Sequence, residues 1–368
     1  MEEHANPLNI PELLEHCMGF LRDLAPDLKA SALVSHSWAS AAQPHLFREV
    51  AFGSSKMERR WPRLDTILNT SPHLIRHIHR LYITCNIQSP PSIEMFAAIC
   101  NFPFTRLSHV SVSQEATLSL PTAIAMQELL SLPTLTHVKI ECHFTQPSIF
   151  RQIWDRCSPS VMHLDLSCTQ AAINSILNHD IPVVSSVRLE SLQTATIGIR
   201  TNRGGWTQTI CPLNISGLKV LSIGPHKEII RWQRMLPALG TLLALNLYIV
   251  DIVDLSLFPT LVLLRVFVSS TALQTALDIF STIAPSSCIR KIVIMRSIFL
   301  ASDVYQQLDS GLSDLPISYP LTVELEMDNE DYNHVIQFFP RLSSRNLLRR
   351  TDVDLHWFEN FSVRSLSL

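Results

Sequence analysis

The residues of this chain that could do chemistry are scattered along it. His77 and His79 stand two apart, which on a strand would put both rings on one face. No third ligand stands near them at the spacing of a metal site. Carboxylate pairs such as Asp352 with Asp354 have no base or nucleophile beside them. The chain also has no phosphate-binding glycine loop and no nucleophile elbow. We therefore expect no enzymatic activity, no metal and no cofactor.

One set of polar residues does recur at a fixed place, beside the central residue of four short apolar segments. The residues before those central positions are Arg80, His109, His137 and His163, and those after are Tyr82, Ser111, Lys139 and Asp165. If the segments are strands, these side chains point away from the core and the three histidines form a column, because neighbouring strands are ~4.8 Å apart. These histidines are either ordinary solvent-exposed residues of a sheet or part of a surface that recognises a partner protein and responds to pH.

The segments belong to a repeat of the form apolar-x-x-apolar-x-apolar. It runs from Ile78/Leu81/Ile83 to Ile289/Ile292/Ile294, with weaker copies near Leu321/Val323/Leu325 and near Val353/Leu355. Helical-looking segments such as Ser92–Phe102 and Thr122–Leu132 stand between the copies. No single copy can bury its own apolar face, so the copies are expected to stack. Strand and helix in alternation predict an α/β fold with parallel strands inside and helices outside.

A different pattern fills the N-terminus. Apolar residues at helical spacing predict short helices over residues 8–48, because Pro11 can start a helix and Leu14, Met18 and Leu21 follow on one face. The pattern restarts at Asp27-Leu28 and continues through Trp38. So short a helical segment has no room for a large core and is expected to dock on something else.

The order of these residues resembles the F-box, with Pro-Glu-Leu-Leu at 11–14, Asp-Leu at 27–28, Leu-Val-Ser-x-x-Trp at 33–38 and a closing aromatic at 47. The later repeat resembles degenerate leucine-rich repeats, whose period is about 20–29 residues. Together they are similar to fungal F-box proteins. The resemblance implies a three-helix F-box over 1–51, a linker and the start of the first repeat over 52–73, and a curved solenoid of about 9–11 repeats over 74–368.

The resemblance also implies a function, that of the non-catalytic substrate-recognition subunit of a Skp-cullin-F-box ubiquitin ligase. The F-box would dock a Skp-type adaptor, and through it cullin, while the concave face of the solenoid binds the substrate protein. The implied adaptor-binding residues are Ile10, Pro11, Leu14, Leu28, Leu33, Val34, Trp38, Leu46 and Phe47. Some of these, Trp38 above all, could instead hold the helices together. The implied substrate-binding residues are Arg80, Tyr82, His109, His137, Lys139, His163 and Asp165.

The composition of the chain limits the class of protein. Charged residues make up 17% of the chain and hydrophobic residues 46%, so much of it must be buried. A net charge of −3 and a pI near 6.6 predict no binding to nucleic acid or to membranes. No signal-peptide pattern or membrane-length apolar run occurs, and the eight cysteines form no C-x-x-C pair. We expect reduced thiols and a cytoplasmic or nuclear location. The alternative function is a leucine-rich scaffold or receptor whose N-terminal helices only cap the solenoid; an enzyme of unrecognised type ranks behind both.

Overall fold

The computed structural model describes residues 10–52, 57–85, 90–144, 152–169, 192–200, 217–223, 240–248, 252–296, 301–317 and 320–351. Its contacts divide the chain into two units. The first unit holds residues 1–143 and 152–160, and the second holds residues 144–151 and 161–368. Parallel strands and helices alternate in each, which confirms the predicted α/β class.

Three short helices open the first unit: α1 (Pro11–Phe20), α2 (Ala25–Ala32) and α3 (His36–Leu46). Pro11 occupies the first helical position of α1, where its missing N–H removes no hydrogen bond. Ser35 caps α3, since its side chain accepts the backbone N–H of Trp38 at 3.3 Å. We call these helices the three-helix module.

Four parallel strands follow in chain order. After the three-helix module come β1 (Glu49–Phe52), α4 (Met57–Thr70), the 3₁₀-helix η2 (Pro72–His77), β2 (Arg80–Cys85), α5 (Pro90–Cys100), β3 (His109–Leu118), α6 (Leu120–Leu130) and β4 (His137–Phe144). Leu81 of β2 pairs with Val50 on one side and Val110 on the other. Within the segment predicted as a linker and the start of the first repeat, 52–73, residues 57–70 form α4, and β1 adds a strand before the first predicted copy.

Where the structure describes the second unit, eight strands run in chain order. They are β5 (His163–Thr169), β6 (Thr194–Arg200), β7 (Val220–Ile223), β8 (Ala244–Tyr248), β9 (Leu263–Val268), β10 (Lys291–Arg296), β11 (Thr322–Glu326) and β12 (Leu348–Thr351). The helices among the described residues of this unit are α9 (Leu273–Ser281), α10 (Ser302–Ser313), α11 (Asn329–Val335) and α12 (Pro340–Ser344), with short 3₁₀ turns η5 (Leu255–Leu257), η6 (Ser270–Ala272) and η7 (Ile336–Phe338). The predicted copy near Val353/Leu355 lies outside the described residues, and β12 instead pairs with β11 through Leu348 and Val323.

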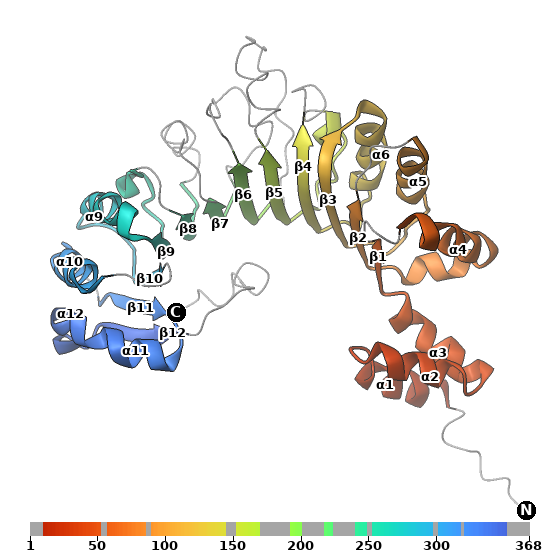
Figure 1. Ribbon diagram of the computed structural model, residues 1–368, viewed down its shortest axis with the longest axis horizontal. Coiled ribbons are helices and arrows are strands. Elements are labelled where there is room, and N and C mark those ends of the chain that lie inside the picture. Colours follow the sequence, from red (N-terminus) through yellow and green to blue (C-terminus); the bar gives the residue numbers. More distant parts are fainter. Residues whose placement is uncertain are drawn as a thin grey trace, which may run out of the picture. The chain divides into compact units, whose positions relative to one another are not determined.

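The central apolar residues of the repeat are paired across the strands of the second unit as the pattern predicts. Leu221, Leu245, Leu264 and Ile292 are Cα partners from one strand to the next, and all four are buried. Figure 1 shows α9 and α10 packed along one side of β9–β11. We call the side to which these four residues point the anchor face, and the other side the opposite face.

Threonine hydroxyl groups form hydrogen bonds between neighbouring copies of the repeat. Thr134 Oγ1 donates to the carbonyl oxygen of Leu107 at 2.7 Å in the first unit. In the second unit Thr241 Oγ1 donates to Leu218 O at 3.1 Å, and Thr260 Oγ1 to Leu242 O at 2.8 Å. Each hydroxyl stands directly before the first apolar residue of its copy. We call this row the hydroxyl ladder; it satisfies a carbonyl at the entrance of each preceding strand.

Candidate protein-binding surfaces

The three-helix module has a small core made only of its own residues. Leu14, Met18, Leu28, Ala41 and Ala42 form one buried cluster. The partly buried residues packed against this cluster are Leu21, Ala32, Trp38 and Leu46. Their packing accounts for why three helices of about ten residues hold together, since isolated helices of this length are marginal in water.

Large apolar side chains remain uncovered around this core. Leu33 and Val34, in the turn between α2 and α3, are 88% and 64% exposed. Ile10 and Pro11 at the start of α1 are also exposed, and Phe47 after α3 is half-buried. Single exposed apolar residues are normal on a protein surface, but several on one small module are typical of a binding surface.

Two of the predicted adaptor-binding residues are not available to a partner. Leu14 is 2% exposed and Leu28 is 1% exposed, because both form the core of the module. Trp38 and Leu46 lie against that core, as the alternative interpretation of Trp38 required. These side chains stabilise the helices, and we leave Leu14 and Leu28 out of the proposed surface.

Sequence reasoning missed three exposed apolar residues in the same module. Leu13, Phe20 and Leu24 are 47%, 75% and 50% exposed. Leu13 and Phe20 are seven residues apart on α1 and so share one helix face, next to the buried face that carries Leu14 and Met18. That spacing was the signal available in the sequence.

A polar face covers the strands of the first unit. Its side chains are Arg80, Tyr82, His109, His137 and Lys139; all are at least partly exposed, and the alternating Leu81, Val110 and Val138 are buried. The strand period of two therefore places the predicted side chains away from the core, as the pattern predicts.

Two of the predicted histidines stack on this polar face. The rings of His109 and His137 lie 3.9 Å apart between centroids and 11° from parallel. The Nδ1 atom of His109 lies 2.8 Å from the hydroxyl of Ser108, and that of His137 lies 2.8 Å from Thr136 Oγ1. Beside them Arg80 forms an ion pair with Glu49 at 3.0 Å. The face thus presents a flat aromatic pair among charges of both signs.

His163 and Asp165 belong to the second unit, on β5. His163 Nδ1 lies 2.7 Å from Thr194 Oγ1 of β6, and burial lowers the pKa of this imidazole below its ordinary value. The ring is therefore held neutral at neutral pH. The structure places it in a different unit from His109 and His137.

Part of the opposite face of the second unit is buried. Val220, Ala244, Leu263 and Val293 form a buried cluster separate from the anchors. Beyond them on this face, the Arg265 guanidinium pairs with the Glu326 carboxylate, and both side chains are 8% exposed. Strands buried on both sides are typical of sheets covered on both faces.

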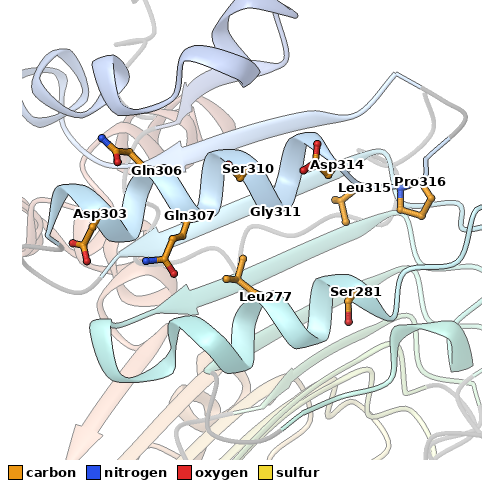
Figure 2. Close-up of a pocket in the computed structure, with 10 residues that line it drawn as sticks. All are labelled: Leu277, Ser281, Asp303, Gln306, Gln307, Ser310, Gly311, Asp314, Leu315 and Pro316. Atoms are coloured by element: carbon orange, nitrogen blue, oxygen red, sulfur yellow. The ribbon is translucent and has the colours of Figure 1, made fainter.

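A pocket of about 770 Å³ opens between α9 and α10 (Figure 2). Leu277 points toward α10 at Gly311, where an added Cβ would lie 2.6 Å from Leu277 Cδ2, so the absence of a side chain allows the two helices to approach. Asp303 and Asp314 stand near the two ends of α10. The residues that line the pocket include no histidine, cysteine or lysine.

Within the described ranges, no group of three or more histidine, cysteine or acidic residues could hold a metal ion. His77 ends η2 and His79 precedes β2, so the two do not share a strand. Burial lowers the pKa of His79, and the positive charges of Arg48, Arg106 and Arg80 lower it further. Burial raises the pKa of the Cys157 thiol to about 12, which makes it a poor nucleophile. Among helices in the described part of the chain, none has the length and apolarity of a membrane span.

No known protein-family model matches the chain, and no curated protein matches it significantly in sequence.

Proposed function

We propose that this chain is the substrate-recognition subunit of a Skp-cullin-F-box ubiquitin ligase. In this proposal the three-helix module is an F-box that docks a Skp-type adaptor. The paired strands of the two units are leucine-rich repeats of a solenoid that holds a substrate protein. The transfer chemistry belongs to other subunits, and the chain itself only brings proteins together.

The observation that carries the proposal is the uncovered apolar surface of the three-helix module. A module that only capped the solenoid would turn its large apolar side chains toward the repeats. Leu33 and Val34 instead remain largely exposed while the module keeps its own core. Interface energy usually concentrates in a few large apolar residues of this kind.

The polar face of the first unit is the proposed substrate-binding surface. The stacked rings of His109 and His137 offer a flat aromatic surface, and Lys139 and the ion pair of Arg80 with Glu49 lie on the same polar face. Aromatic and arginine side chains are enriched in protein interfaces, because they bury a large area and still reach a polar partner. His163 and Asp165 are proposed as further contacts on the second unit.

The proposal is tested by the binding of purified Skp-type adaptor to the full chain. We expect a stable complex from the wild-type chain and none from a Leu33→Asp, Val34→Asp variant, whose charges would enter a desolvated contact. Ile67→Asp is the matched control, since Ile67 is also an exposed apolar residue but lies on α4. If the wild-type chain does not retain the adaptor, the capped-scaffold alternative replaces this proposal.

A further inference from the structure

Cationic side chains gather where the strands of the first unit begin. All of them are at least partly exposed, and none belongs to the polar face described above. They are Arg48, His73, Arg76, His77, His79 and Arg106, and we call them the basic edge. Because the whole chain has a net charge of −3, this concentration of positive charge is a local feature.

Backbone hydrogen bonds fix part of the basic edge to the sheet. Arg48, His79 and Ser108 stand directly before β1, β2 and β3. The N–H of His79 donates to the carbonyl oxygen of Arg48 at 2.9 Å, and the N–H of Ser108 donates to His79 O at 2.9 Å. Arg48 and His79 are therefore neighbours at the entrances of adjacent strands.

Two buried residues turn the neighbouring side chains outward. Ile78 is 1% exposed and its backbone is extended, with φ −79° and ψ 112°. His77 and His79, on either side of it, therefore lie on the side away from the core. Leu107 is 0% exposed and follows Arg106 directly, at the entrance of the next strand.

The positive charges of the basic edge act on one another and are not neutralised. Burial lowers the pKa of His77, and the charges of Arg76 and Arg106 lower it further. Arg48 and Arg106 act in the same direction on His79. Among the described residues, no carboxylate forms an ion pair with Arg48, Arg76 or Arg106. Like charges held together without a counter-charge favour an anionic partner.

We propose that the basic edge binds an acidic segment of a partner protein, in which aspartate or glutamate alternates with other residues. Guanidinium groups form paired hydrogen bonds with carboxylates. On an extended segment, carboxylates two residues apart lie on one side at a spacing of ~6.6 Å. The entrances of β1 and β3 are two strand spacings apart, or ~10 Å, so two or three carboxylates can span the basic edge. The inference does not depend on the proposed ligase function.

A nucleic acid fits the basic edge less well than an acidic peptide does. The net charge of −3 and the pI near 6.6 provide no long-range attraction for a polyanion. The three arginines of the basic edge are also fewer than the roughly 6–10 phosphate contacts that hold many proteins on DNA. Paired carboxylates on a short segment need no larger surface.

The test measures fluorescence anisotropy of a short labelled peptide of alternating glutamate and serine, titrated with the full chain. We expect saturable binding that weakens as salt is added, and no binding of the matching glutamine-serine peptide. Arg76→Glu with Arg106→Glu should weaken binding by about 10-fold or more, because like charges then face each other. Arg156→Glu is the matched control, since Arg156 is an exposed arginine of the same unit that pairs with Glu128 at 3.1 Å, and it should bind as wild type does.

Three outcomes would overturn the proposal. The first is the absence of saturable binding by the wild-type chain, and the second is an equal loss in Arg156→Glu and in the double variant. The third is tighter binding of a single-stranded oligonucleotide of the same charge, which would make the partner a nucleic acid.

A second measurement uses the wild-type chain and so does not depend on the folding of a variant. Phenylglyoxal modifies exposed arginines, and mass spectrometry locates the modified residues. The glutamate-serine peptide should slow the modification of Arg76 and Arg106 several-fold and leave that of Arg156 unchanged. Equal rates at Arg76 and Arg106 with and without the peptide would also overturn the proposal.

Discussion

Replacing Thr260 by valine should weaken the strand order around β9, because the change removes one rung of the hydroxyl ladder at constant size. Thr260 Oγ1 lies 2.8 Å from Leu242 O and 3.0 Å from Gly240 O. Losing such a hydrogen bond costs about 0.5–1.5 kcal/mol, and a carbonyl left unpaired in a buried place adds about 1–3 kcal/mol. Thr260 is only half-buried, so water can partly replace the hydroxyl. We expect a loss of about 1–2 kcal/mol.

Hydrogen exchange measures this loss locally, which matters because two units can unfold separately. The backbone N–H of Leu263 donates to Leu243 O at 3.0 Å, next to the altered rung. Its exchange should become about 5–30-fold faster in Thr260→Val, the factor that corresponds to 1–2 kcal/mol. Thr260→Ser keeps the hydroxyl and should exchange nearly as wild type does. Equal exchange in the serine and valine variants would refute the role of the hydroxyl.

Three further changes test the packing and charges described above. Leu14→Ala should destabilise the three-helix module by about 2–5 kcal/mol, whereas the exposed Leu33→Ala should stay within about 0.5 kcal/mol; thermal unfolding compares them, and similar losses would contradict the assigned core. The folded-state pKa of His163 is lowered, so its contribution to the free energy of unfolding is full above the unfolded pKa of about 6.5 and is lost as pH falls toward the folded pKa. In His163→Gln the free energy of unfolding, measured by urea titration, should therefore fall less steeply as the pH is lowered. A pH dependence equal to that of wild type would contradict a lowered pKa for His163. Arg265→Met should cost about 3–5 kcal/mol in urea unfolding by leaving Glu326 buried and unpaired, and adding Glu326→Leu should restore much of it; no recovery in the double variant would argue against the pair.

Much of the strand arrangement could be predicted from the sequence, because it depends on a strong local signal. The pattern aligned Leu221, Leu245, Leu264 and Ile292, and these residues are Cα partners in the sheet. A one-residue error in any copy would have turned an anchor to the opposite face. The buried anchors therefore support the whole register.

Elements with mixed or sparse patterns were not found. Residues 57–70 begin with a polar, basic stretch and contain Pro62, which argues against a helix interior. The helix α4 forms all the same, because Leu68 is buried and Trp61 packs on Phe52 and Phe102. β12 was not predicted, since Leu348 is the only apolar residue in it.

The candidate surfaces were only partly predictable for a different reason. Helical spacing separates apolar residues from polar ones, but it does not say which apolar residues fill a core and which face a partner. Leu14 and Leu33 read alike in the sequence, and the structure places one in the core and the other in solvent. The burial of Val220, Ala244, Leu263 and Val293 on the opposite face likewise depends on tertiary packing, which no local pattern encodes.

The hydroxyl ladder has a consequence for how the length of the chain can vary. Its rungs join residues 27 positions apart at Thr134, 23 apart at Thr241 and 18 apart at Thr260, yet each rung joins one strand entrance to the next. The ladder fixes the ends of a connection and leaves its length free, and the entropy of closing a loop grows only slowly with length. Insertions and deletions between strands should therefore leave the sheet in register. Peptide tags or whole domains can be inserted there to report on the fold without rebuilding it.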